Sequence, residues 1–151
     1  TRATLAGSDL YLVGGGDPLL RKTKGENSLK ALALDTISAL KTRKVTNIRL
    51  FFDDSLFTGP ALGPGWKSSF PKAGIAGPVS ALSVGGGRVS PGSVARVSNP
   101  AKQAGRLFAK RLKKAGIGVS QVRRGQAPSR SSQLASVSSE PVRTIVEEIV
   151  R

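Results

Sequence analysis

The chain has 151 residues, of which 24 are Lys or Arg and 9 are Asp or Glu, so its formal net charge is +15. It contains no Cys and no His, which excludes zinc fingers, cysteine nucleophiles and imidazole bases, and so few carboxylates predict no metal site. Met is also absent, which indicates a processed protein, a fragment or a chain without its ends. The charge indicates anionic surroundings, namely nucleic acid, anionic lipid or an acidic cell-wall polymer. No apolar stretch is long enough to span a membrane.

The first elements along the chain are a strand and a helix. Residues 9–13 are predicted as a strand, and the glycine run of residues 14–18 ends it in a turn. A helix is predicted over residues 29–42, with Asn27 or Ser28 as its N-cap. Apolar residues recur there at steps of three and four, which gives the helix one apolar stripe: Leu29, Leu32, Ala33, Ile37 and Leu40.

The middle of the chain combines two predicted strands with an irregular stretch. Residues 45–52 form the strongest predicted strand. Gly and Pro then recur through residues 59–78 and exclude a regular element there. Residues 79–84 are predicted as a further strand, which a turn at residues 85–87 follows.

A second helix is predicted over residues 100–115. Pro100 suits the first helical position, Ser98 or Asn99 serves as N-cap, and Gly116 is the natural residue after the helix. Its apolar side consists of Ala101, Ala104, Leu107, Phe108, Leu112 and Ala115, and its opposite side of Lys102, Arg106, Lys110 and Lys113. A basic side of this kind is more often a solvated face than a phosphate-binding one.

The last residues predict two short strands and one more helix. The strands are residues 119–122 and 134–137, and the helix begins at Pro141 with an apolar stripe of Val142, Ile145, Val146 and Ile149. A helix followed by a strand thus occurs twice, over residues 32–52 and 107–122. The repetition predicts a layered α+β fold in which helices lie on a sheet.

Motifs for cofactors and catalysis are absent or weak. The run that begins at Gly14 lacks the last glycine of the dinucleotide pattern G-x-G-x-x-G, and no glycine run continues into G-K-[S/T], so no cofactor is predicted. Ser69 and Lys72 fit the pattern S-x-x-K, in which an amine activates a serine. A motif this loose is expected about once by chance. Because Pro71 stands between them in a stretch where no helix is expected, we interpret the pair as not catalytic.

Two carboxylates, Asp53 and Asp54, close the strongest predicted strand. Adjacent residues of a strand point to opposite faces, so the two cannot act together as an acid/base pair. One of them could bind a cationic group, since strand ends that face a loop often carry function. The alternative is a role in stabilising the turn.

Six segments, taken together, resemble one family. They are residues 9–18, 53–60, 63–66, 77–84, 114–119 and 134–139. In this order they are similar to the class C low-molecular-mass penicillin-binding proteins, the D-alanyl-D-alanine carboxypeptidase/endopeptidase family. The resemblance places the chain after the family's S-x-x-K nucleophile motif and before its S-x-N and K-T-G motifs, neither of which the sequence contains.

The resemblance implies an α+β fold with mixed small sheets and packed amphipathic helices. The chain would be the accessory region inserted into a serine-type transpeptidase-like fold. Its parts would be two accessory subdomains, residues 1–76 and 77–133, and a segment that leads back into the transpeptidase-like domain, residues 134–151.

The resemblance also implies an activity for the whole enzyme. It would be an extracytoplasmic serine-type carboxypeptidase that releases the terminal D-Ala of peptidoglycan stem peptides and is trapped by β-lactams through the transpeptidase-like domain. The segment alone is predicted to be inactive and to hold no catalytic residue, cofactor or metal. Its basic surface would suit an anionic cell-wall polymer.

For the site, the resemblance implies two substrate-binding residues, Asp53 and Phe57. They belong to the pattern D-x-S-x-F, completed by Ser55, which in the family approaches the pocket for the diamino acid of the stem peptide. A carboxylate there would pair with the free amine of that residue. The alternative function, from the residues alone, is a basic module that binds nucleic acid.

Overall fold

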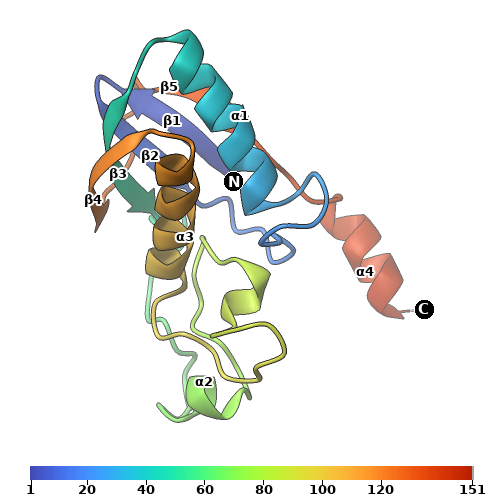
Figure 1. Ribbon diagram of the computed structural model, residues 1–151. Helices are drawn as coiled ribbons and strands as arrows, with labels where there is room; N and C mark the ends of the chain where they lie inside the picture. Colours follow the sequence, from blue (N-terminus) through green and yellow to red (C-terminus); the bar gives the residue numbers. More distant parts are fainter. Residues whose placement is uncertain (151) are drawn as a thin grey trace.

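Five strands form one mixed sheet in the order β4-β3-β2-β1-β5 (Figure 1). The structure, a computed structural model, describes residues 1–150 without the side chains of residues 148 and 149. Arg151, the end of the predicted segment 134–151, and the side chain of Ile149 therefore lie outside the described residues. The strands are β1 Arg2–Ala6, β2 Asp9–Val13, β3 Asn47–Asp53, β4 Gly118–Arg124 and β5 Ser132–Ser136.

The sheet is antiparallel on one side and parallel on the other. β1 pairs antiparallel with β2 and β5, whereas β2, β3 and β4 run parallel. The predicted α+β class is confirmed, and the strands belong to one sheet instead of several small ones. The division at residues 1–76, 77–133 and 134–151 stays a prediction, and all three ranges contribute strands to this sheet.

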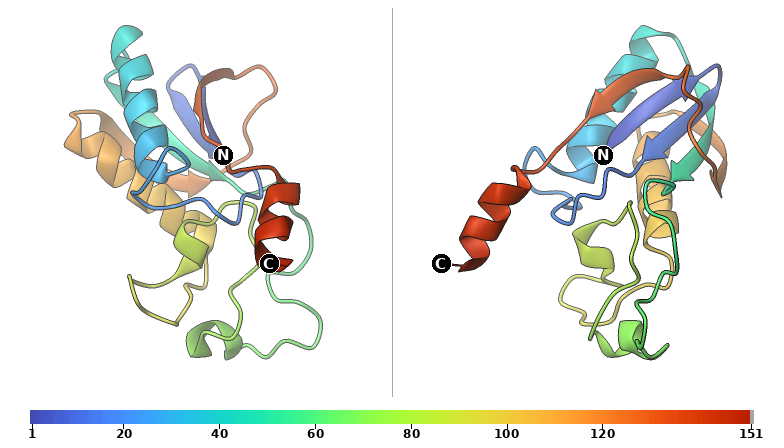
Figure 2. Two further views of the ribbon diagram at one scale, coloured as in Figure 1. Left: turned by 90° about the vertical axis from the view of Figure 1, so that its right-hand side faces the viewer. Right: turned by 180° about the vertical axis from the view of Figure 1, so that it is seen from behind.

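Two long helices cross from strand to strand on one face of the sheet (Figures 1 and 2). α1, Leu29–Thr42, connects β2 to β3, and α3, Pro100–Lys114, connects β3 to β4. Parallel strands require such crossovers, so the two predicted helix–strand repeats are the two parallel connections of the sheet. The fully buried side chains between the helices and the sheet include Leu10, Leu12, Leu32, Leu40, Leu50, Phe108 and Leu112.

The helix ends follow the predicted caps. Ser28 is the N-cap of α1, because its Oγ accepts a hydrogen bond from the backbone N–H of Ala31 at 3.1 Å. Asn99 caps α3 in the same way, through a 2.9 Å bond to its Oδ1 from the N–H of Lys102. Gly116, just past α3, has a φ of +87°, which a residue with a Cβ rarely adopts.

Three short elements complete the chain. α2, Phe70–Ala73, is a single turn within the Gly/Pro-rich stretch that was predicted to contain no helix, and the 3-10 turn η1 is Gly85–Gly87. Pro71 is tolerated in α2 because it stands in the first turn. The last helix, α4, is Val142–Val150 and stands apart from the sheet, with Val142 and Val146 exposed (Figure 1).

The prediction of a strand at residues 79–84 is wrong. The segment is irregular, although Ala81, Leu82 and Val84 are buried. Its backbone groups are bonded locally and to the glycine run: Ser80 Oγ accepts from the N–H of Leu82 at 3.2 Å, and the N–H of Gly16 donates to Ala81 O at 2.8 Å. The segment thus packs as a buried loop beside the sheet, and it needs no partner strand.

The glycine run at residues 14–16 allows residues 81–82 to pack closely against it. A Cβ built on Gly14 would clash with the carbonyl oxygen of Ala81 and would lie 2.7 Å from Cβ of Leu82. Residues 14–17 are therefore irregular backbone that lies against residues 81–82, and a turn follows only at residues 18–19.

We expect Gly14→Ala to destabilise the fold by about 1–3 kcal/mol, because backbone atoms must move to admit the methyl group. The measurement is urea unfolding followed by circular dichroism. Gly77→Ala is the matched control, since its Cβ would meet only the flexible side chain of Arg96 at 3.4 Å. Equal stability of the two variants would contradict the role given to Gly14.

Candidate functional site

A hollow of about 460 Å³ opens beyond the carboxyl ends of β3 and β4. Parallel strands end at the same edge of a sheet, and such edges are where open α/β sheets place ligands. Its walls come from the loop after β3, the loop before residue 81, the N-terminus of α3 and the end of β4. The lining residues used below are Asp54, Ser55, Phe57, Ser80, Asn99 and Arg124.

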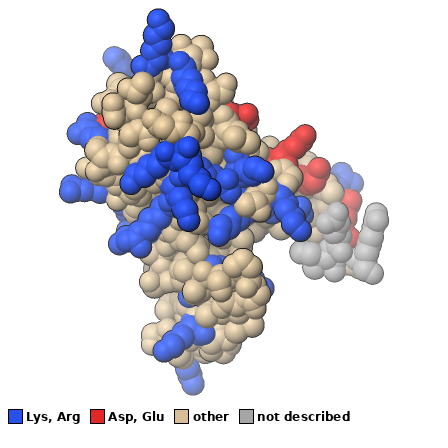
Figure 3. Space-filling view, in the orientation of Figure 1, with Lys and Arg blue, Asp and Glu red and all other residues tan. Residues whose placement is uncertain are grey.

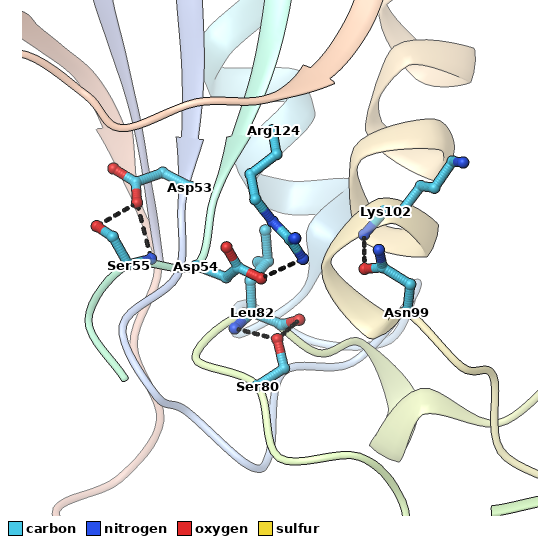
Figure 4. A network of polar contacts seen from close by, with 8 residues as sticks. All are labelled: Asp53, Asp54, Ser55, Ser80, Leu82, Asn99, Lys102 and Arg124. Atoms are coloured by element: carbon cyan, nitrogen blue, oxygen red, sulfur yellow. Dashed lines mark hydrogen bonds and ion pairs between the residues drawn. The ribbon is translucent and has the colours of Figure 1, made fainter. Parts of the chain in front are cut away.

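An ion pair supplies the charge of the hollow. Nη2 of Arg124 lies 2.9 Å from Oδ2 of Asp54 (Figure 4). The guanidinium also lies over the ring of Phe52, 5.8 Å from the ring centre, which restricts where it can point. The Asp54 side chain is 21% exposed and that of Arg124 60% exposed, so both remain accessible to a ligand. We call this site the Asp54–Arg124 hollow.

Asp53, one of the two predicted site residues, is buried and points away from Asp54 (Figure 4). Its Oδ1 accepts from the N–H of Ser55 at 3.0 Å and from the Oγ–H of Ser55 at 2.6 Å. Its Oδ2 accepts from the N–H of Ala127 at 2.7 Å. These bonds compensate for the burial of the carboxylate and tie the loop after β3 to the connection between β4 and β5.

Phe57, the other predicted site residue, lines the hollow and is 46% exposed. A Cβ on Gly16 would come within 2.8 Å of its ring, so the ring rests directly on that glycine. The structure thus brings Phe57 and Asp54 to the hollow and turns Asp53 to the other side. That opposition is the one expected for adjacent residues at a strand end.

The sequence prediction missed Arg124. The signal was present, because the pair Arg123-Arg124 follows a predicted strand just as Asp53-Asp54 does. Only the parallel pairing of β3 with β4, in which Phe52 stands opposite Arg124, shows that the two strand ends meet.

Two other polar residues of the hollow form hydrogen bonds with backbone groups. Ser80 Oγ is bonded to the N–H and the carbonyl of Leu82, and the Oδ1 of Asn99 accepts from Lys102 (Figure 4). The chemistry open to a ligand includes a carboxylate, a guanidinium, an aromatic ring and the hydroxyls of Thr58 and Ser98, which suits binding. Among the side chains that the structure describes, no cluster of three or more carboxylate, imidazole or thiol groups has metal-site geometry.

The sequence profile of the D-Ala-D-Ala carboxypeptidase 3 (S13) family matches residues 2–95 and 91–151. The chain belongs to this carboxypeptidase family. It is 33% identical over 139 residues to a carboxypeptidase of Mycobacterium tuberculosis, covering 88% of this chain and 30% of that protein. It is 30% identical over 109 residues to the carboxypeptidase DacB of Mycolicibacterium smegmatis, covering 68% of this chain and 24% of that protein.

A solved structure of the penicillin binding protein 4 (dacB) from Haemophilus influenzae shares the fold. The TM-score is 0.64 at 16% identity, over 98% of this chain and 48% of that one. The predicted resemblance to this carboxypeptidase family is thus confirmed, and the chain spans about a third or less of its curated relatives' length.

The S-x-x-K pattern of this sequence, formed by Ser69 and Lys72, lies outside the hollow. Ser69 is the N-cap position of α2 and Lys72 lies within that turn. Neither residue lines the hollow. The interpretation that this pair is not catalytic therefore stays a prediction.

A second group of polar and aromatic residues lies on the helix-free face of the sheet. Arg49 donates to both carboxylate oxygens of Asp9, at 2.6 and 2.9 Å, and this bond raises the pKa of Arg49. Tyr11 stacks on Phe51 with ring centres 5.1 Å apart, and burial together with nearby Asp9 raises the pKa of Tyr11. The Arg49 and Asp9 charges thus satisfy each other on this face of the sheet.

We expect Asp53→Asn to lower the free energy of unfolding by about 1–3 kcal/mol, because an amide nitrogen replaces an oxygen that accepts a hydrogen bond. Asp54→Asn is the adjacent control, and its cost should stay within about 1 kcal/mol because it removes only a partly exposed ion pair. Urea unfolding of the two variants measures the difference. A larger loss for Asp54→Asn would contradict the anchoring role of Asp53.

Proposed function

We propose that the chain is the accessory segment of a serine-type D-Ala-D-Ala carboxypeptidase that acts on peptidoglycan stem peptides outside the cytoplasm. The observation that carries the proposal is the match to the carboxypeptidase family over nearly the whole chain. The relatives are named carboxypeptidases, and the transfer of their activity applies to the longer protein of which this chain is a part. No helix among the described residues is long and apolar enough to cross a membrane.

The Asp54–Arg124 hollow is the proposed subsite for the diamino acid of the stem peptide. The carboxylate of Asp54 complements the free ammonium, the guanidinium of Arg124 complements a carboxylate beside it, and Phe57 covers the aliphatic part. In this proposal the two residues named from the sequence differ in role. Phe57 contacts the substrate, whereas Asp53 acts as a positioning residue that holds the loop carrying Asp54.

The serine chemistry of the proposed enzyme lies in the transpeptidase-like domain. The sequence of 151 residues contains neither S-x-N nor K-T-G, so it cannot assemble the family's set of catalytic motifs. β-Lactams would therefore acylate the complete enzyme. The alternative of a nucleic-acid-binding module has no support in the family match.

We expect the isolated chain to form no covalent adduct with a fluorescent penicillin. The measurement is denaturing gel electrophoresis after incubation, with the complete enzyme as the positive control. A labelled band at the size of this chain would overturn the assignment of the serine chemistry to the transpeptidase-like domain.

In the complete enzyme, Asp54→Asn should raise KM for a stem peptide with a free diamino-acid amine by about tenfold, with kcat little changed. A loss of binding shared by the ground state and the transition state has this signature. The same peptide with its amine acetylated should show no difference between the wild type and Asp54→Asn.

Arg49→Gln is the matched control, since it breaks the other accessible Arg–Asp pair, on the helix-free face of the sheet. A KM increase equal to that of Asp54→Asn, or an equal effect of Asp54→Asn on the acetylated peptide, would contradict the proposed subsite.

A further inference from the structure

The solvent side of α3 carries a dense row of cations, which we call the α3 basic face. It is made of Lys102, Arg106, Lys110, Arg111, Lys113 and Lys114, with Lys30 of α1 beside its end. Figure 3 looks onto this side of the molecule and shows Lys and Arg side chains across its middle, with Asp and Glu confined to its margins. None of the ion pairs formed by described residues includes a cation of this face.

The direction of the face is fixed by packing. The opposite side of α3 is buried against the sheet and α1 through Ala101, Ala104, Phe108 and Leu112. The helix cannot turn its cations elsewhere without exposing this core, which makes the basic face a permanent feature of the surface. Covering it with a neutral protein surface would desolvate several unpaired cations, which is costly.

Helix stability explains only three of the six α3 cations of the α3 basic face. Arg111, Lys113 and Lys114 lie in the last turn, where cations complement the helix dipole. Lys102 lies in the first turn, which contains no acidic residue, and there the dipole disfavours positive charge. Arg106 and Lys110 lie between the two end turns, where the dipole has little effect. Helix stability therefore explains none of these three cations, and a partner outside the helix is the better explanation for them.

The cations are arranged for a linear partner. Lys102, Arg106, Lys110 and Lys114 are four residues apart, and each such step advances about 6 Å along a helix. Hollows accompany the row, one of about 730 Å³ beside Lys102 and Arg106 and one of about 530 Å³ beside Lys110 and Lys113. A smaller hollow of about 220 Å³ joins Arg111 and Lys114 to Lys30 of α1. The cations therefore have hollows on both flanks of α3, toward β4 and toward α1.

The lining of these hollows selects among anionic partners. They contain no aromatic side chain, whereas proteins that bind single-stranded nucleic acid stack bases on aromatic rings. A helix that lies on a membrane exposes its apolar side, and the apolar side of α3 is buried. What remains is charge at regular spacing, with Lys as a point charge and Arg as a fork for phosphate oxygens.

We propose that the α3 basic face binds a linear phosphodiester polymer without bases, which lies extended along α3 with its phosphates on successive cations. The inference goes beyond the proposed function and does not depend on it, because it concerns a different surface of the chain from the Asp54–Arg124 hollow. Such a contact would hold the protein at a phosphate-bearing wall polymer.

The test is binding of the chain to fluorescently labelled poly(glycerol phosphate), measured by anisotropy between 50 and 200 mM salt. Four phosphate contacts predict a slope of log K against log salt near −2.8, which is a loss of about fiftyfold in affinity over this range. Replacing Lys102, Arg106, Lys110 and Lys114 by Gln should abolish most of the slope. All four are exposed, so the replacements leave the core intact.

A control variant removes the same charge elsewhere, through Lys24→Gln, Lys41→Gln, Lys67→Gln and Lys72→Gln, which are also exposed. It should retain the greater part of the slope. Equal losses in the two variants would show that only net charge matters and would overturn the proposal. Both variants should unfold like the wild type, which circular dichroism checks.

Charge-matched probes distinguish the other partners. Oligo(dT) with the same number of phosphates and vesicles of phosphatidylglycerol should both bind more weakly than poly(glycerol phosphate). Equal or tighter binding of oligo(dT) would favour nucleic acid, and equal or tighter binding of the vesicles would favour a membrane surface. Either result would overturn the proposal and leave the carboxypeptidase assignment untouched.

Discussion

The parallel pairing of β3 with β4 is the constraint on which the site depends. In this register Leu50 stands opposite Val122 and Phe52 opposite Arg124, so β3 and β4 end at the same edge of the sheet. An antiparallel pairing would carry Arg124 to the far end of β3 and leave Asp54 without its partner. Parallel pairing in turn requires a crossover, and α3 provides it. The 2.9 Å ion pair of the hollow is thus a consequence of topology.

The close packing of α3 on β3 determines which side chains of the helix are buried and which are exposed. A Cβ on Gly105 would lie 3.0 Å from Cδ1 of Phe52, so the helix approaches the strand as closely as only glycine permits without adjustment. Glycine within a helix costs about 0.5–1 kcal/mol relative to Ala, and this cost is offset by the close burial of Phe108 and Leu112 beside it. The same approach brings Asn99 and Pro100 to the rim of the hollow and directs Lys102 and Arg106 outward.

The helices were predictable from the sequence because their signals are local. The apolar period and the caps Ser28 and Asn99 are contained in one stretch of chain, and the structure reproduces α1 over residues 29–42 as predicted. The strand at residues 79–84 was wrong because β-propensity reports a side-chain preference and not the presence of a partner strand. β1, Arg2–Ala6, was missed for the converse reason, since its two Ala residues are weak strand formers and its pairing with β2 and β5 defines it.

The site was predictable only in part, for a related reason. Alternation along a strand correctly separates Asp53 from Asp54, but which of the two lines the hollow depends on the loop that follows and on Ala127, 74 residues away along the chain. The pairing of Asp54 with Arg124 spans 70 residues, and only the register of β3 with β4 brings the two side chains together. A resemblance to a known family, based on short segments, pointed to the loop after β3, and the three-dimensional contacts show which residues of that loop line the hollow.

The positive charge of the α3 basic face affects which ligands can approach the Asp54–Arg124 hollow. Asp9 and Asp54 are paired with arginines and Asp53 is bonded to the backbone and to Ser55, so none of them neutralises the cations of α3. A ligand that brings an ammonium group to Asp54 therefore approaches a strongly positive molecule, and the repulsion acts over a Debye length of about 10 Å at 0.1 M salt. Lys102 lies one helical turn from Asn99 at the rim of the hollow, well within that range. A polyanion on the α3 basic face would cancel this repulsion locally, so the two proposed partners, an anionic wall polymer and a cationic stem-peptide side chain, are compatible with each other.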